Sequence, residues 1–118
     1  FDLTDKKDPT MGELLAAWKP YKKDIKQKQR LKNIPLLFSE LGYTAQDGTN
    51  MHPWNYTIPD TLDLQEQKDC YTAFTKVWKN DQELYGVFFY EWFGKGGDKD
   101  FGYTPRGRPA LEVAKKWF

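Results

Sequence analysis

Hydrophobic positions along this chain form two patterns, helically spaced segments and continuous apolar runs. Residues 10–33 have the helical pattern, and Thr10 and Glu13 have the spacing of a capping box, in which each side chain accepts from the other's backbone N–H. Pro20 is expected to interrupt or restart this helix. A second helix, of about fifteen residues, is predicted after Asp63, because Asp63 followed three residues later by Glu66 offers a second N-terminal cap.

Two continuous apolar runs, residues 34–38 and 84–90, predict strands that are buried on both faces. Polar residues and a long loop follow each run, at 42–59 and 94–107, and a last helix is predicted from Pro109. The order helix, strand, loop, helix, strand, loop, helix is typical of α/β folds in which helices cover a parallel sheet. In such folds the functional site lies beyond the carboxyl ends of the strands.

Two strands cannot close a sheet of this kind, because a (β/α)8 barrel needs eight strands in about 250 residues. The chain has 118 residues and begins at Phe1 rather than Met. We therefore expect it to be incomplete on its own, with the remaining N-terminal part of its domain elsewhere. If that part is absent, we expect exposed strand edges and association with other chains rather than a stable monomer.

The aromatic content is high, with five Trp, seven Tyr and eight Phe, so some rings are expected to face a ligand or a partner surface. The net charge of +1 argues against binding to nucleic acid or to an anionic membrane surface, and no run is long enough to span a membrane. Residues 19–32 hold seven basic residues and one acidic residue, which we interpret as a solvated helix face. The single cysteine, Cys70, excludes an internal disulfide and is expected to be buried.

Glu40 follows the first apolar run, with only Ser39 between them. A carboxylate at this place is costly unless the strand end opens into a polar cleft. Two interpretations follow: a nucleophile or general base at the mouth of a site, or a carboxylate paired with Arg or Lys. Position alone does not separate them.

Five segments, at 35–43, 53–54, 63–67, 85–92 and 100–110, carry a resemblance that runs over nearly all of the chain. Together they resemble the C-terminal part of glycoside hydrolase family 113, which belongs to a clan of retaining (β/α)8-barrel glycosidases and includes β-mannanases. The resemblance implies that residues 1–118 are the C-terminal part of a single barrel domain. The elements would be equivalent to helix 6, strand 7, helix 7, strand 8 and helix 8.

The resemblance also implies site residues. Glu40 corresponds to the nucleophile of the clan, and Trp92 to the aromatic that forms the floor of a sugar subsite at the end of the eighth strand. The acid/base is implied at the end of the fourth strand, which lies in the missing N-terminal part of the barrel. Strand alternation would point Glu91 away from Trp92, so Glu91 is not expected to be the acid. No cofactor is implied.

The loop after the first strand holds further candidates. Sugar rings present C–H patches to aromatic faces and hydroxyl groups to polar side chains, so Tyr43, His52, Trp54 and Asn55 are candidate subsite residues. No metal site is predicted, because His52 has no second ligand at a suitable spacing. Turn chemistry explains the acids of the glycine-rich second loop as well as ligand binding does.

The sequence therefore predicts a retaining glycoside hydrolase that cleaves β-linked oligo- or polysaccharides, with β-mannan as one candidate, although this chain alone would be inactive. A non-catalytic carbohydrate-binding or structural barrel fragment is the alternative. Residues 55–57 form an N-glycosylation sequon at Asn55. Secretion is expected mainly from the enzyme class.

Overall fold

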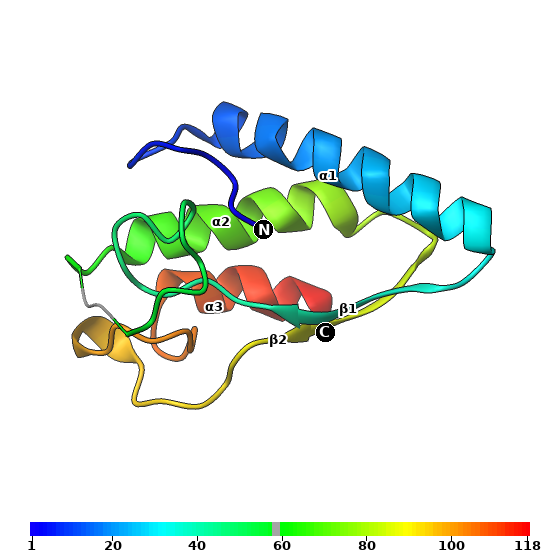
Figure 1. Cartoon of the computed structure of the whole chain (residues 1–118). Coiled ribbons are helices and arrows are strands. Elements are labelled where there is room, and N and C mark those ends of the chain that lie inside the picture. The colour runs from blue at the N-terminus through cyan, green and yellow to red at the C-terminus, as the bar shows by residue number, and fades with distance from the viewer. Residues whose placement is uncertain (58–59) are drawn as a thin grey trace.

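The computed structural model describes residues 1–57 and 60–118. Within them the chain forms an α/β unit in which the helices lie on one side of a two-stranded parallel sheet, and α2 packs between α1 and α3 (Figure 1). The elements are α1 (Met11–Lys32), β1 (Leu36–Leu41), α2 (Leu64–Trp78), β2 (Leu84–Phe89) and α3 (Pro109–Ala114), with 3₁₀ turns at Gly97–Lys99 and Lys115–Trp117.

The predicted helix starts are confirmed. Thr10 and Glu13 form both halves of a capping box, and the Asp63 carboxylate accepts from the Glu66 amide at 2.8 Å. The expectation that Pro20 interrupts or restarts the first helix was wrong, because α1 is one helix of 22 residues that contains Pro20. No helix among the described residues combines the length and the apolar character needed to cross a membrane.

The second strand lies where its apolar run predicted it, whereas β1 begins at Leu36 and extends to Leu41, so that it includes Glu40. Neither strand is buried on both faces. Leu37 of β1 is 51% exposed and Phe88 of β2 is 63% exposed, whereas Phe38 is buried. The reason is that the helices cover one face of the sheet only. The expectation of strands buried on both faces is therefore corrected.

The covered face of the sheet carries an aromatic core. The ring of Phe38 lies 4.9 Å from that of Trp78 and 5.1 Å from that of Phe74, both in edge-to-face geometry, and Trp18 of α1 joins the same cluster. Cys70 is fully buried in α2, as predicted. This core holds β1 and both long helices together.

The basic stretch of α1 is not only a solvated face. Lys22 and Lys26 reach across to the segment between α2 and β2, where each ammonium lies 3.0 Å from a carboxylate oxygen of Asp81, and Lys26 also pairs with Glu83. The side chains of Lys26 and Asp81 are only 11% and 9% exposed. The sequence interpretation of this stretch is thus corrected for Lys22 and Lys26, which link α1 to the start of β2.

Stability in acid should depend on Asp81. Burial acts to raise the pKa of this carboxyl, but hydrogen bonds from Lys26 and Lys22 outweigh it and lower the pKa to about 2. The folded-state pKa thus lies below the unfolded value of about 3.9. The ionised carboxylate therefore stabilises the fold by about 2 kcal/mol above about pH 4, and this contribution is lost as the pH falls through the folded-state pKa.

Chemical denaturation of an Asp81→Asn variant tests this dependence. Its free energy of unfolding should lie about 2 kcal/mol below that of the unmodified protein at neutral pH, and the difference should fall below about 0.5 kcal/mol at pH 2. Asp24→Asn is the control, because Asp24 forms an exposed i,i+4 pair with Lys28 and should change stability by less than about 0.5 kcal/mol. An Asp81→Asn effect of equal size at both pH values would contradict the assignment.

Candidate functional site

The loops that follow β1 and β2 gather at the carboxyl end of the sheet, beside the start of α2 (Figure 1). Hydrogen bonds join them. The Ala45 amide donates to the Gly102 carbonyl at 3.1 Å, and the Tyr103 hydroxyl donates to the Pro53 carbonyl at 2.7 Å. The two long loops therefore form one surface at the edge where α/β folds bear their sites.

A depression of about 340 Å³ opens in this surface. Aromatic rings form most of its wall, and it contains one carboxylate. It is lined by Phe1, Glu40, Leu41, Gly42, Tyr43, Pro53, Trp54, Tyr56, Tyr90 and Tyr103.

Glu40 is the carboxylate of the depression. It is the penultimate residue of β1 and lies where the register with β2 is irregular, between Phe38 and Leu41. Such irregularities change the direction of side chains and are frequent next to active sites. Glu40 is exposed, and no ion pair to it occurs within residues 1–57 and 60–118. An Arg or Lys partner of the kind that the alternative interpretation requires is thus not found among the described residues.

The walls present aromatic faces beside this carboxylate. Trp54 is 64% exposed, and its ring lies 5.6 Å from that of His52. The Tyr103 ring, which also lines the depression, packs edge-to-face against Tyr90 at 5.1 Å and lies 6.2 Å from Tyr56. A sugar ring could stack its C–H face on such a wall while its hydroxyl groups meet the carboxylate.

The other first-loop candidates lie differently. Tyr43 is 2% exposed and packs its ring 5.6 Å from that of Tyr71, so the phenol is a core group under the depression. His52 and Asn55 line a second, smaller depression of about 120 Å³, in which Lys7 bridges Asp47 and Asp60. Across the described residues no cluster of His, Cys, Asp or Glu side chains is placed to hold a metal ion.

Trp92 does not line the Glu40 depression. It is 61% exposed and borders an apolar cavity of about 540 Å³ together with Glu91 and Phe118, and the Arg106 guanidinium lies 5.9 Å from its ring. The alternation assumed for Glu91 and Trp92 does not apply, because β2 ends at Phe89 and both residues line the same cavity. In this chain Trp54 therefore lines the same depression as Glu40, whereas Trp92 lines a different cavity.

Comparison with known proteins identifies the family. The sequence profile of Glycoside Hydrolase Family 113 matches residues 7–102. The chain belongs to glycoside hydrolase family 113. No curated protein matches this chain.

Solved structures of family 113 enzymes share the fold. The β-mannanase AaManA from Alicyclobacillus acidocaldarius, in complex with ManMIm, is 25% identical with a TM-score of 0.78. A β-1,4-mannanase of the family in a complex structure is 21% identical, and another β-1,4-mannanase structure is 22% identical, both with a TM-score of 0.78. Each match covers 87% of this chain and 35% of the other, so the family 113 chain described here spans about a third of the length of these structures.

The start of α2 holds the first loop of this family 113 chain in place. The buried Glu66 carboxylate accepts from the Gly48 amide at 2.8 Å, and from the backbone amide and side-chain Nδ2 of Asn50 at 2.9 and 2.7 Å. Asn50 in turn accepts from the Leu3 amide at 2.7 Å through its backbone carbonyl. The sequence indicated Glu66 only as part of a cap, and its partners lie too far along the chain for a local pattern to reveal them.

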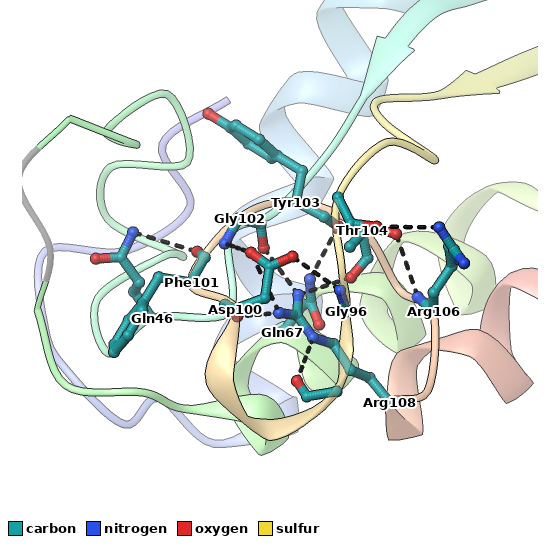
Figure 2. Close-up of polar contacts among 12 residues, drawn as sticks. Gln46, Gln67, Gly96, Asp100, Phe101, Gly102, Tyr103, Thr104, Arg106 and Arg108 are labelled. Atoms are coloured by element: carbon teal, nitrogen blue, oxygen red, sulfur yellow. Dashed lines mark hydrogen bonds and ion pairs between the residues drawn. The ribbon is translucent and has the colours of Figure 1, made fainter.

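The second loop of the family 113 chain is held by Arg108, as Figure 2 shows. The guanidinium donates to the carbonyls of Gly97 and Gly102 at 2.9 Å and of Thr104 at 2.6 Å, and it also contacts Asp100. The Asp100 carboxylate accepts from the amides of Gly96 and Gly102 at 2.8 Å. Turn formation thus accounts for Asp100. It is one of the two interpretations that the sequence left open for the acids of this loop.

Removing the Tyr103 hydroxyl should loosen the bridge between the loops. Burial, with the neighbouring Tyr90 and Tyr56, raises the pKa of Tyr103 to about 12, so the phenol stays protonated and donates to Pro53 throughout the neutral range. A Tyr103→Phe variant should lose about 1 kcal/mol of unfolding free energy in chemical denaturation. A Tyr103→Phe variant as stable as the unmodified protein would argue against the bridge.

Proposed function

We propose that this chain supplies the nucleophile and part of the sugar site of a retaining glycoside hydrolase, with Glu40 as the nucleophile. One observation carries the proposal: Glu40 is the only carboxylate among the described residues that line an aromatic depression at the carboxyl ends of parallel strands. Membership of family 113 supports the same chemistry. The absence of an ion pair to Glu40 within the described residues leaves its oxygens accessible to a substrate.

The proposed reaction is a double displacement. A carboxylate attacks the anomeric carbon as the glycosidic bond breaks and the leaving oxygen takes a proton from a carboxylic acid, and water then hydrolyses the glycosyl ester. The two carboxyl groups of a retaining enzyme lie about 5 to 5.5 Å apart. Because Glu40 is the one carboxylate at the depression in this part of the molecule, we assign the acid/base to a part of the domain outside these residues.

We further propose that the chain is the C-terminal part of one (β/α)8 barrel, in which β1 and β2 are the seventh and eighth strands. Two observations support this. The exposed side chains of Leu37, Tyr85 and Phe88 give the uncovered face of the sheet an apolar surface, and the solved family structures are about three times longer than the matched region. Further strands of the same domain would pair with the open edges and cover this face.

The substrate proposed is a β-linked mannan, because the similar solved structures are β-mannanases. Proton NMR of the full-length protein acting on a β-1,4-linked manno-oligosaccharide tests both substrate and mechanism. The first product should appear with the β configuration at the new reducing end. An α product would refute retention, and binding without hydrolysis would identify a carbohydrate-binding protein instead of an enzyme.

A further inference from the structure

Gln67 is a buried amide that contacts both loops of the site. It lies in the first turn of α2 with no exposed surface. Its Nε2 donates to the Tyr43 carbonyl at 2.9 Å and to the Tyr103 carbonyl at 3.0 Å (Figure 2). Both acceptors belong to residues that line the Glu40 depression, one in the loop after β1 and the other in the loop after β2. A single side-chain nitrogen therefore ties the two loops together.

The amide group at this position is not explained by core packing. Its Oε1 is buried and has no hydrogen-bond partner among the described residues, which costs free energy. The orientation is fixed by its neighbours, because two carbonyl oxygens can only accept and the NH₂ group must face them. An apolar side chain of similar length would avoid the unpaired oxygen. What the amide supplies, and an apolar side chain cannot, is a fixed distance between two carbonyls.

The bond to Tyr43 acts on the backbone next to Glu40. The Leu41 carbonyl accepts from the Tyr90 amide at 2.8 Å. Gly42 lies so close to the Tyr90 carbonyl that a Cβ on it would come within 2.0 Å of the oxygen. The segment after Glu40 is thus held by Tyr90 at Leu41 and by Gln67 at Tyr43.

We propose that Gln67 is a positioning residue of the site, which sets the spacing of the two loops and thereby the place of Glu40 relative to the aromatic wall. This inference rests on the proposed glycosidase function. A displacement of about 1 Å in a reacting group can lower the rate of a reaction by about a hundredfold. Loss of the two hydrogen bonds should accordingly affect turnover more than substrate binding.

A Gln67→Met variant of the full-length protein, compared with Gln65→Met, tests the proposal. Gln65 lies on the same turn of α2, is exposed, and donates to Asp69 at 2.9 Å. For a β-1,4-linked manno-oligosaccharide, Gln67→Met should lower kcat by about tenfold to a hundredfold with KM changed less than about threefold. Gln65→Met should leave both unchanged. A folded Gln67→Met protein with normal kcat would overturn the proposal.

A second variant keeps the test decisive if Gln67→Met does not fold. In Gln67→Glu the buried side chain faces two carbonyl oxygens, which favours its protonated form, and one O–H donor then replaces two N–H donors. Its kcat should fall between those of the unmodified protein and of Gln67→Met. A kcat equal to that of the unmodified protein would show that two donors are not needed and would also overturn the proposal.

Hydrogen exchange separates failure of this inference from failure of the proposed function. The Ala45 amide bonds across the loops to the Gly102 carbonyl, so Gln67→Met should speed its exchange by about tenfold or more. The Leu84 amide donates to the backbone carbonyl of Asp81, far from the loops. It is the internal reference, and its exchange rate should not change. Unchanged Ala45 exchange would refute the role of Gln67 even in an active enzyme. Absence of hydrolysis in the unmodified protein would refute the function while leaving the loop test valid.

Discussion

Replacing Glu40 with Gln is expected to lower kcat for the hydrolysis of a β-1,4-linked manno-oligosaccharide by about four orders of magnitude or more. The amide is nearly isosteric with the carboxylate but carries no negative charge, so it cannot attack the anomeric carbon to form a glycosyl ester. Because Glu40 is exposed, the unfolding free energy should change by less than about 0.5 kcal/mol. Steady-state kinetics and chemical denaturation of the full-length protein measure the two effects.

Glu112→Gln is the matched control for this experiment, because Glu112 is an exposed glutamate of α3 that pairs with Lys115 just after the helix. It should retain the activity of the unmodified protein. A Glu40→Ala variant adds a second test, since a small anion such as azide can enter the vacated space. Azide should restore turnover of a substrate with a good leaving group and yield a glycosyl azide of α configuration. Near-normal turnover by Glu40→Gln would place the nucleophile elsewhere.

Replacing Arg108 with Met is expected to lower the free energy of unfolding by about 3 to 5 kcal/mol. The guanidinium is fully buried and donates to the carbonyls of Gly97, Gly102 and Thr104, which methionine would leave without this donor. Arg108→Lys should recover only a small part of the loss, because one ammonium cannot reproduce the planar fork of donors. Denaturant unfolding monitored by tryptophan fluorescence measures the change.

Arg106→Met is the control for Arg108. Arg106 lies two residues earlier in the same loop, is exposed, and donates to the Gly94 carbonyl at 3.0 Å. Its loss should cost less than about 1 kcal/mol. If Arg108→Met were equally mild, the second loop would be held chiefly by other contacts, and the description of the loop as fixed around one guanidinium would be wrong.

The sequence predicted the features that depend on neighbours along the chain. Thr10 with Glu13 and Asp63 with Glu66 marked the helix starts because a capping residue and its partner lie three positions apart. The apolar runs indicated both strands because their residues are consecutive along the chain. Glu40 could be recognised because it closely follows an apolar run, and a carboxylate in that place needs an explanation.

Features that depend on distant parts of the chain were missed. Gln67 contacts Tyr43 and Tyr103, 24 and 36 residues away, and the Tyr103 hydroxyl contacts Pro53, 50 residues away. No periodicity in a single sequence encodes such pairs. The exposure of Leu37 was missed for a related reason, because an apolar side chain indicates that a strand can be covered, but not what covers it.

Trapping of the covalent intermediate tests the central claim most directly. A 2-deoxy-2-fluoro-β-mannoside with a good leaving group should slow both steps, because fluorine disfavours the oxocarbenium-like transition state, while the leaving group lets the glycosyl ester accumulate. Mass spectrometry of the digested full-length protein should then find one fluorosugar on the peptide that contains Glu40. A label on a different carboxylate, or continued hydrolysis with inversion and no label, would contradict the assignment of Glu40 as the nucleophile.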